Sequence, residues 1–386
     1  MREHAADIQK TRHLPPEPVK REHSVPWFWP MAAGIELGVT GLELFDQNLH
    51  FAAEALKLES PPAPAWATAN RITLELDTMR LRDFTVQGDA DTLVPVLIDA
   101  PFAGHSSTIA DYAPSQSLIE TLRAAGINKL FATDWKSATE HMKWYDIDKY
   151  LTEINVIVDD LGGVVNLVGL CQGGWMCAMY AARFPHKVRS LVLAGSPIDT
   201  DAGHGEIQRM VHELPMTFYE NIVELGNGLM PGKMMLAGWK SMHPEQQYVD
   251  KYIDLYTHIE NRNYVKRTET FERWYENPID LPGTYYLQAV KQLFRDNLLA
   301  KGQFVALGQK INLRSIKVPT YLLAGESDDI TPPEQVFAAE KLIGTAASNV
   351  IKKLVPGGHI GLFMGSQTLV TAWPGIGQWI VENGKQ

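Results

Sequence analysis

A cysteine flanked by glycines is the residue in this sequence best suited to covalent chemistry. Cys171 lies in the run Gly169-Leu170-Cys171-Gln172-Gly173-Gly174, between an apolar stretch that ends at Val168 and a helical stretch that begins at Trp175. Small residues two positions on either side of a nucleophile leave room for the sharp strand-to-helix turn that presents it. We therefore predict that Cys171 is a nucleophile, although a buried inert thiol is the alternative for a glycine-flanked cysteine. Cys177, the second of two cysteines, fits that inert alternative.

Two later segments supply a base and an acid. His359 follows the apolar run Val350–Val355, and Asp328 and Asp329 follow the apolar run Thr320–Ala324. The order nucleophile, acid, base along the chain is that of α/β-hydrolases. Residues that follow parallel strands gather at one edge of the sheet, so we expect the three side chains to meet there. We predict that His359 is the base and that Asp328 orients it, with Asp329 as the competing acid.

The negative charge that develops on an attacked carbonyl oxygen needs hydrogen-bond donors. We expect one donor to be the backbone amide of Gln172, which follows the nucleophile. The other is expected from Phe102 or Ala103, in the loop after the strand Val94–Ile98. These amides would form the oxyanion hole.

Substrate contacts are expected from the same regions. His105 either contacts substrate or caps its loop, and Trp175 is a further candidate for substrate contact. A group of methionines and aromatic residues between positions 234 and 286 either lines a channel for an apolar substrate or packs as plain core. The members of this group are Met234, Met235, Trp239, Tyr252, Trp274, Tyr285 and Tyr286.

Short apolar runs alternate with helical segments through much of the chain. Ile72–Leu76 and Met79–Phe84 predict an antiparallel pair of strands. The later runs are wholly apolar, as strands buried on both faces are. They are Val94–Ile98, Lys129–Ala132, Val164–Val168, Leu191–Ala194 and Thr320–Ala324, separated by helical segments such as Ser117–Ala125 and Tyr150–Leu161. This alternation predicts the α/β class and, with the nucleophile turn, an α/β-hydrolase fold: a mostly parallel sheet flanked by helices.

The pattern divides the chain into three parts. Residues 66–198 and 316–386 are predicted to form the α/β-hydrolase core, and the helical residues 199–315 a cap inserted in it. Residues 1–65 are expected to contain a disordered N-terminus, an amphipathic helix and a proline-rich linker. The apolar face of that helix runs from Met31 to Leu56. We expect it to dock on the catalytic domain, with a partner subunit or a lipid-like inclusion as the alternative.

Composition excludes several classes of function. A net charge of -10 without a long Lys/Arg cluster argues against nucleic-acid binding. Two cysteines six residues apart in one helical stretch do not predict a disulfide, which fits a reducing compartment. The early sequence shows neither a secretory signal nor a membrane span. Because neither a nucleotide-binding glycine loop nor a metal-binding motif is present, no metal or cofactor is expected.

The segments around Cys171, Asp328 and His359 together resemble the polyhydroxyalkanoate synthase and intracellular depolymerase superfamily. The resemblance extends from about Trp66 to Trp379. Both branches of that superfamily are represented. The synthase branch is similar at Cys171-Gln172-Gly173-Gly174, at Ile109-Ala110-Asp111 with Pro114 and Ser117, and at Lys301-Gly302. The depolymerase branch is similar at Gly104-His105, Pro197-Ile198-Asp199-Thr200, Tyr285-Tyr286-Leu287-Gln288 and Asp328-Asp329.

The resemblance implies a cysteine-centred site for 3-hydroxyacyl esters beneath a cap, carried onto Cys171, Asp328 and His359. The first function that the resemblance implies is that of a hydrolase, an intracellular polyhydroxybutyrate depolymerase, because the depolymerase-like residues cluster at the oxyanion and acid loops. The alternative is a synthase that polymerises 3-hydroxyacyl-CoA, and a third reading is a non-catalytic granule-associated protein. The partners implied are 3-hydroxyacyl polyester or 3-hydroxyacyl-CoA, a polyester granule surface and a homo-oligomer, in the cytoplasm or at granules.

Overall fold

The computed structural model describes residues 50–58, 61–86, 94–242, 245 and 249–385. The disorder expected at the N-terminus and most of the predicted amphipathic helix lie outside these residues. Its last part, residues 50–58, is helical. The chain divides into two units, Met1–Ala53 and Glu54–Gln386, and the second contains everything described below.

Within the described residues, the second unit is built on an eight-stranded sheet with the order β1-β2-β4-β3-β5-β6-β11-β12. The strands are β1 (Arg71–Glu75), β2 (Met79–Asp83), β3 (Val96–Asp99), β4 (Leu130–Trp135), β5 (Val165–Leu170), β6 (Val188–Ala194), β11 (Thr320–Gly325) and β12 (Val350–Val355). β1 pairs antiparallel with β2, and β2 with β4, while the remaining neighbours are parallel. The predicted antiparallel opening pair and parallel sheet are confirmed.

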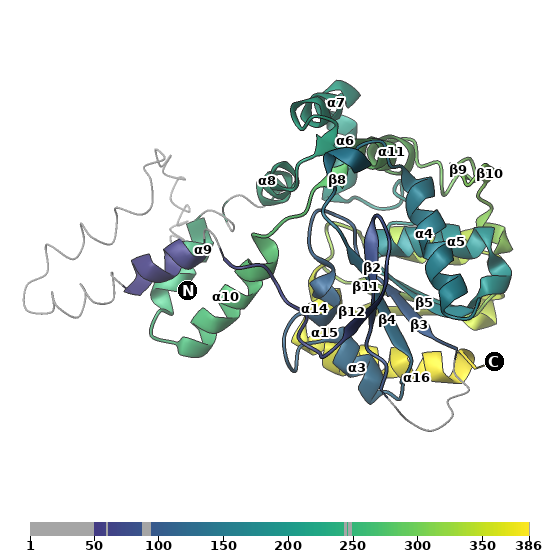
Figure 1. Ribbon diagram of the computed structural model, residues 1–386, viewed down its shortest axis with the longest axis horizontal. Coiled ribbons are helices and arrows are strands. Elements are labelled where there is room, and N and C mark those ends of the chain that lie inside the picture. Colours follow the sequence, from purple (N-terminus) through teal and green to yellow (C-terminus); the bar gives the residue numbers. More distant parts are fainter. Residues whose placement is uncertain (1–49, 59–60, 87–93, 243–244, 246–248, 386) are drawn as a thin grey trace, which may run out of the picture. The chain divides into compact units, whose positions relative to one another are not determined.

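Helices cover both faces of this sheet, as Figure 1 shows. One face packs against α4 (Ile147–Asp160) and α5 (Gln172–Arg183), and the other against α3 (Leu118–Ala124) and α16 (Trp373–Asn383). Successive strand residues alternate between the two layers: Leu97 belongs to the first core, and Val96 and Ile98 to the second. This period-two alternation explains why the central strands read as continuous apolar runs. The expected α/β-hydrolase fold is confirmed.

Residues 199–315, called the cap below, are mainly helical. They contain α6 (Glu206–Glu213), α7 (Met216–Leu225), α8 (Gly232–Met242), α9 (Lys251–Thr257), α10 (Arg262–Tyr275), α11 (Gly283–Gln288) and a π-helix at Ala289–Arg295, with the short strands β7 (Leu229–Met230), β8 (Leu281–Pro282), β9 (Val305–Ala306) and β10 (Gln309–Lys310). The core resumes after β11 with α12 (Pro333–Phe337), α13 (Ala339–Leu342), α14 (Gly361–Met364) and α15 (Ser366–Thr371). The predicted change from alternating strands to helices therefore occurs, while the boundaries 199 and 315 stay a prediction.

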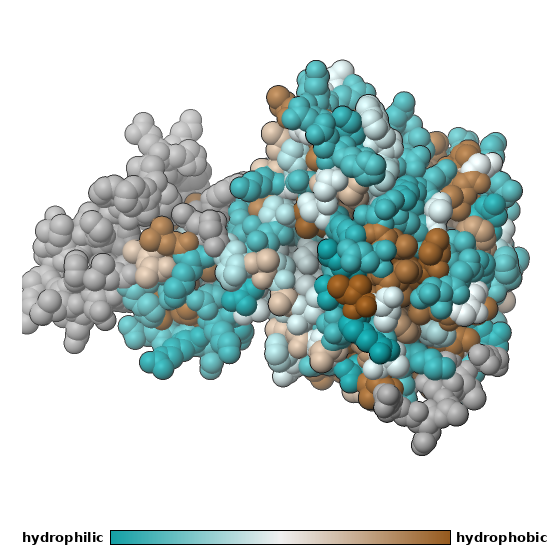
Figure 2. All heavy atoms as spheres, in the orientation of Figure 1, coloured by the Kyte–Doolittle hydropathy of each residue, from teal (hydrophilic) through white to brown (hydrophobic). Residues whose placement is uncertain are grey.

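The surface is mostly polar, with apolar residues in patches separated by hydrophilic ones on the face in Figure 2. β12 forms one edge of the sheet, and its residues 351–354 are all exposed. Lys352 and Lys353 occupy the centre of that edge strand. Among the described residues, no helix has both the length and the apolar character needed to cross a membrane.

Candidate active site

Cys171 lies at the turn between β5 and α5, with backbone angles φ 51° and ψ -117°. A positive φ is costly for a residue with a side chain, and it persists only where surrounding structure enforces it. Here the glycines permit the turn. A Cβ on Gly169 would lie 2.4 Å from the Gly174 Cα, and one on Gly173 would lie 2.1 Å from the Asp99 carbonyl oxygen. The clearance predicted for Gly169 and Gly173 is therefore required by the geometry.

His359 and Asp328 meet at the same edge of the sheet. Nδ1 of His359 lies 2.7 Å from Oδ2 of Asp328. The other carboxylate oxygen, Oδ1, accepts hydrogen bonds from the backbone amides of Ile330 (3.1 Å) and Thr331 (2.8 Å). Both oxygens of the buried carboxylate are thus used, one to orient the imidazole and one to fix the carboxylate itself.

Asp329, the competing acid, serves another element. Its backbone carbonyl accepts a hydrogen bond from the amide of Glu206 at 2.8 Å, at the start of α6. The structure therefore brings Asp328 into hydrogen-bond contact with His359.

The pKa of His359 is set by opposing effects. Burial lowers it, but the negative charge of Asp328, the charge of Cys171 and hydrogen bonds to both raise the pKa well above its ordinary value. An imidazole with a raised pKa accepts and retains a proton readily. That property suits a base acting on the neighbouring thiol.

Cys171 and His359 open onto a cavity of about 130 Å³ between the core and the cap. Cys171 is only 8% exposed, so solvent has little access to its side chain. Most of its wall is apolar. The lining residues are Pro101, Ala103, His105, Ser106, Ile109, Cys171, Trp239, Met242, Trp274, Tyr275, Ile330, His359, Ile360 and Phe363.

The cap methionines and aromatics divide between the two roles left open by the sequence. Trp239 and Trp274 line the cavity. Tyr285 is fully buried and packs in the core edge-on to Phe102 and tilted against Tyr150, with ring centroids 5.1 and 4.8 Å away. Met234 is 42% exposed and belongs to neither.

Two of the oxyanion donors predicted from the sequence, Gln172 and Ala103, belong to the nucleophile turn and to the cavity wall. Gln172 is the first residue of α5, and Ala103 lines the cavity. The backbone amides of Gln172, Phe102 and Ala103 make no hydrogen bond to another residue in the described part of the chain. The side chain of Phe102 takes no part in the cavity wall. Its ring is fully buried and packs against Trp135 at a centroid distance of 5.2 Å.

His105 and Trp175 have different fates. His105 lines the cavity, and its Nε2 lies 3.2 Å from the backbone carbonyl oxygen of Tyr275. Trp175 is not in the cavity wall. It is 1% exposed and stacks on Tyr285 at 6.2 Å in the core. The structure therefore does not bring Trp175 to the site, because its side chain leaves α5 toward the interior.

The sequence reasoning missed Tyr275, Ile330, Ile360 and Phe363 in the cavity wall. Ile330 and Ile360 each follow one of the two predicted polar residues closely, at Asp328 and His359, and this proximity was the available signal. Tyr275 carried no comparable signal, because it reaches the site only through packing of the cap.

Comparison with known proteins places the chain in a family. Residues 78–353 match a family model described as "Protein of unknown function (DUF3141)". The chain is 28% identical over 324 residues to a poly(3-hydroxyalkanoate) polymerase subunit PhaC of Haloferax mediterranei, covering 82% of this chain and 65% of that protein. It is 27% identical to the same subunit of Allochromatium vinosum, covering 75% of this chain and 80% of that protein.

A solved carboxylesterase structure from Nitrososphaera gargenis has the same fold, with a TM-score of 0.50 at 12% identity over 80% of this chain and 98% of that one. The chain belongs to the DUF3141 family, within the polyhydroxyalkanoate synthase-like superfamily of α/β-hydrolases.

Proposed function

We propose that this protein is an acyltransferase that uses Cys171 to take a 3-hydroxyacyl group from a coenzyme A thioester and pass it to the hydroxyl group of another 3-hydroxyacyl unit. The observation that carries the proposal is a thiol on a strained turn, beside a histidine–aspartate pair, in the wall of an apolar cavity. The names of the curated relatives support polymerisation, and they favour it over the depolymerase function that the sequence placed first.

In the first half-reaction, His359 takes the proton of the Cys171 thiol and the sulfur attacks the carbonyl carbon of the thioester. Negative charge moves to the carbonyl oxygen, where the unpaired amides of Gln172 and Ala103 are its donors. The tetrahedral intermediate collapses by breaking the bond to the coenzyme A sulfur, which leaves with the proton held by His359. Asp328 stabilises the imidazolium while it carries that proton.

In the second half-reaction, His359 takes the proton of the acceptor hydroxyl group. The oxygen then attacks the acyl group on Cys171, an ester bond forms, and the sulfur leaves and regains its proton from His359. Water in place of the hydroxyl acceptor would give hydrolysis. A cavity with an apolar wall and an 8% exposed nucleophile limits access of water, which favours transfer.

Polyester hydrolysis is the second candidate function. His105, part of the depolymerase-like pair Gly104-His105, lies in the cavity wall next to the nucleophile. Hydrolysis would use the same three side chains with water as the acceptor. A polyester granule surface and a second copy of the chain are proposed partners under either function.

One experiment separates the two functions. The purified protein is incubated with 3-hydroxybutyryl-CoA or, separately, with amorphous poly(3-hydroxybutyrate), with Cys171→Ala as the control. Transfer predicts free coenzyme A together with insoluble polyester from the first substrate and no soluble acid from the second. Soluble 3-hydroxy acids from polymer, with no polymer formed from the thioester, would show that the enzyme is a hydrolase.

A further inference from the structure

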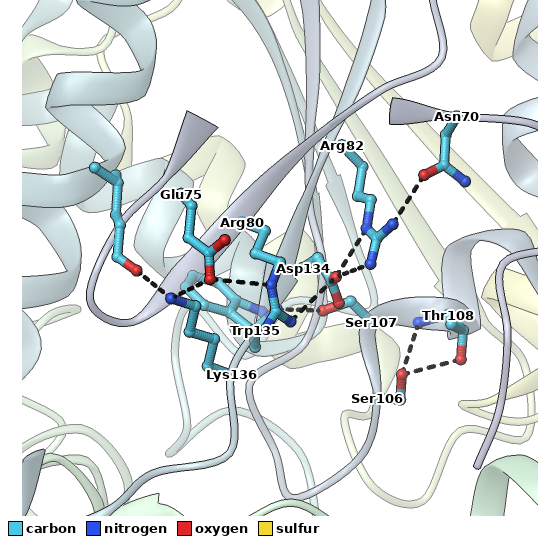
Figure 3. Close-up of polar contacts among 11 residues, drawn as sticks. Asn70, Glu75, Arg80, Arg82, Ser106, Ser107, Thr108, Asp134, Trp135 and Lys136 are labelled. Atoms are coloured by element: carbon cyan, nitrogen blue, oxygen red, sulfur yellow. Dashed lines mark hydrogen bonds and ion pairs between the residues drawn. The ribbon is translucent and has the colours of Figure 1, made fainter. Parts of the chain in front are cut away.

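The loop that carries the predicted oxyanion donors, residues 100–107, is held by the core at both ends. Thr133 accepts the amide hydrogen of Ala100 at 3.0 Å, and the indole Nε1 of Trp135 donates to the Ala100 carbonyl at 2.8 Å. At the other end, the backbone amide of Trp135 donates to Oγ of Ser107 at 3.0 Å, a contact visible in Figure 3. Both anchors come from the end of β4.

The middle of the same loop is held by the cap. The indole Nε1 of Trp239, in α8, donates to the Ala103 carbonyl at 3.2 Å, and that of Trp274, in α10, donates to the Ser106 carbonyl at 3.0 Å. The amide of Ile279 donates to the Gly104 carbonyl at 2.8 Å. Three carbonyl groups of one short loop therefore point to donors in the cap.

Close packing accompanies these bonds. Gly104 has φ +88°, and a Cβ at this position would lie 2.8 Å from the sulfur of Met235 in α8. His105 stacks on Trp274 and Tyr275 at centroid distances of 4.7 and 5.1 Å. Burial lowers the pKa of His105 to about 4, so its ring is neutral near pH 7 and Nε2–H donates to the Tyr275 carbonyl.

The bonds from the cap constrain the amides of the loop. A peptide unit is planar, so fixing the Ala103 carbonyl fixes the whole unit that joins Ala103 to Gly104. Only the two rotatable backbone bonds of Ala103, φ and ψ, separate its own amide from that unit. The direction in which the Ala103 amide points consequently depends on where the cap holds the loop.

We infer that Trp239 and Trp274 are positioning residues, whose indole N–H groups hold the oxyanion loop in its catalytic conformation only while the cap is closed. The inference rests on the proposed function, because it needs an oxyanion at Cys171. A cap that moves away to admit substrate breaks these hydrogen bonds, and its return restores the donor geometry. Substrate enclosure and charge stabilisation are thereby one event.

The test uses Trp239→Phe and Trp274→Phe, which remove the indole donor and retain an aromatic ring. Trp144→Phe is the matched control, because Trp144 is 75% exposed and makes no hydrogen bond to the loop. All variants carry Cys177→Ala, so that Cys171 is the remaining cysteine. Two rates are measured: release of coenzyme A from 3-hydroxybutyryl-CoA, and alkylation of Cys171 by iodoacetamide.

Alkylation displaces iodide at a saturated carbon and forms no oxyanion, so it reports the nucleophile without the loop. We expect kcat to fall about tenfold in each Trp variant, less than the ~10²–10³ lost when an oxyanion donor is removed outright. KM should stay within about twofold, and alkylation should be at least as fast as in the control. For a variant that does not fold, site-specific incorporation of the tryptophan analogue with sulfur in place of the indole N–H removes the donor at constant shape.

Unchanged kcat in both Trp variants, or alkylation that slows in proportion to kcat, would overturn the inference. A rise in KM alone would also overturn it, since the indoles would then act only as substrate contacts. Failure of the proposed function looks different: the parent protein itself would not release coenzyme A from 3-hydroxybutyryl-CoA.

Discussion

The core and the cap hold their shares of the active site by different physical means. In the core, Cys171 directly follows β5, and Asp328 and His359 lie within four residues of the ends of β11 and β12. Backbone hydrogen bonds between neighbouring strands therefore set their spacing. The cap instead reaches the site through side chains, such as the indoles of Trp239 and Trp274. A backbone-built site survives many substitutions, whereas a site built by side chains depends on each contact.

Buried charges emphasise this difference. Glu272 of α10 is 2% exposed and pairs with Lys251 of α9 at 2.8 Å. Lys251 also lies 3.6 Å from Glu276, which pairs with Lys240 of α8 at 2.5 Å. Such pairs add little net stability compared with apolar packing, but removing one partner leaves an uncompensated charge. The ion pairs that join the cap helices are therefore sensitive to the loss of any single charged partner.

The largest expected effect is in the core. Cys171→Ala should abolish acyl transfer, a loss on the order of 10⁶ in turnover by analogy with other nucleophile deletions. The fold should be retained, because the change removes one sulfur atom. Cys177→Ala is the control and should change turnover little. Release of coenzyme A from 3-hydroxybutyryl-CoA measures both, and substantial activity in Cys171→Ala would exclude this residue as the nucleophile.

Asp328→Asn should have the next largest effect. An amide cannot hold the imidazole in the required tautomer or stabilise its charged form, and turnover should fall by about 10⁴. Asp329→Asn should be milder, because the observed hydrogen bond to Nδ1 of His359 is made by Asp328. Steady-state kinetics of the two variants decide between them. The reverse ranking would move the acid role to Asp329.

The cap prediction concerns stability. Lys251→Met leaves the carboxylates of Glu272 and Glu276 together in a buried site, and should lower the free energy of unfolding by about 3 kcal/mol. Adding Glu272→Leu should recover most of that loss, since an apolar pair of similar volume replaces the ion pair. Lys143→Met is the control, because its partner Glu140 is 81% exposed and the pair is 3.7 Å apart. Urea denaturation measures all four proteins, and equal losses in Lys251→Met and the control would show that the cap charges do not link its helices.

The last prediction returns to the core and concerns the pH dependence of stability. Asp99 is fully buried, with its carboxylate oxygens near Thr133 and Cys177, and burial raises its pKa to about 8. The folded state therefore keeps a proton that the unfolded state releases above pH ~4. The stability contributed by this group is fully present below that pH and is lost as the pH rises to about 8, at roughly 1.4 kcal/mol per pH unit.

Asp99→Asn cannot ionise and should lack this slope. The free energy of unfolding is measured for both proteins at pH 5 and pH 7. Relative to the parent, the variant should be more stable at pH 7 than at pH 5. Identical pH dependence in both proteins would mean that Asp99 is already ionised in the fold.

The same contrast explains what the sequence could predict. β11 was predicted to within one residue, because a buried strand leaves an uninterrupted apolar run. β12 was predicted at its observed bounds from the apolar residues at its two ends, although two lysines occupy its exposed centre. The nucleophile turn and the histidine–aspartate contact followed from their places after those strands. The direction of Trp175 could not be predicted, because α5 is buried on nearly all sides and has no polar face to orient it. The indole bonds to the oxyanion loop join residues more than 130 positions apart, and no local pattern records them.

The exposed edge strand β12 has a consequence for how copies of this protein behave at high concentration. A free strand edge is a template for pairing with another chain, and such pairing leads to aggregation. In a symmetric antiparallel pairing of two copies about the strand centre, Lys352 would face Lys353 of the other copy on both sides. Like charges directly opposite each other destabilise a strand pair. Lys353 therefore opposes self-association through this edge, while the charge of Lys352 is partly offset by Glu340, 2.5 Å away.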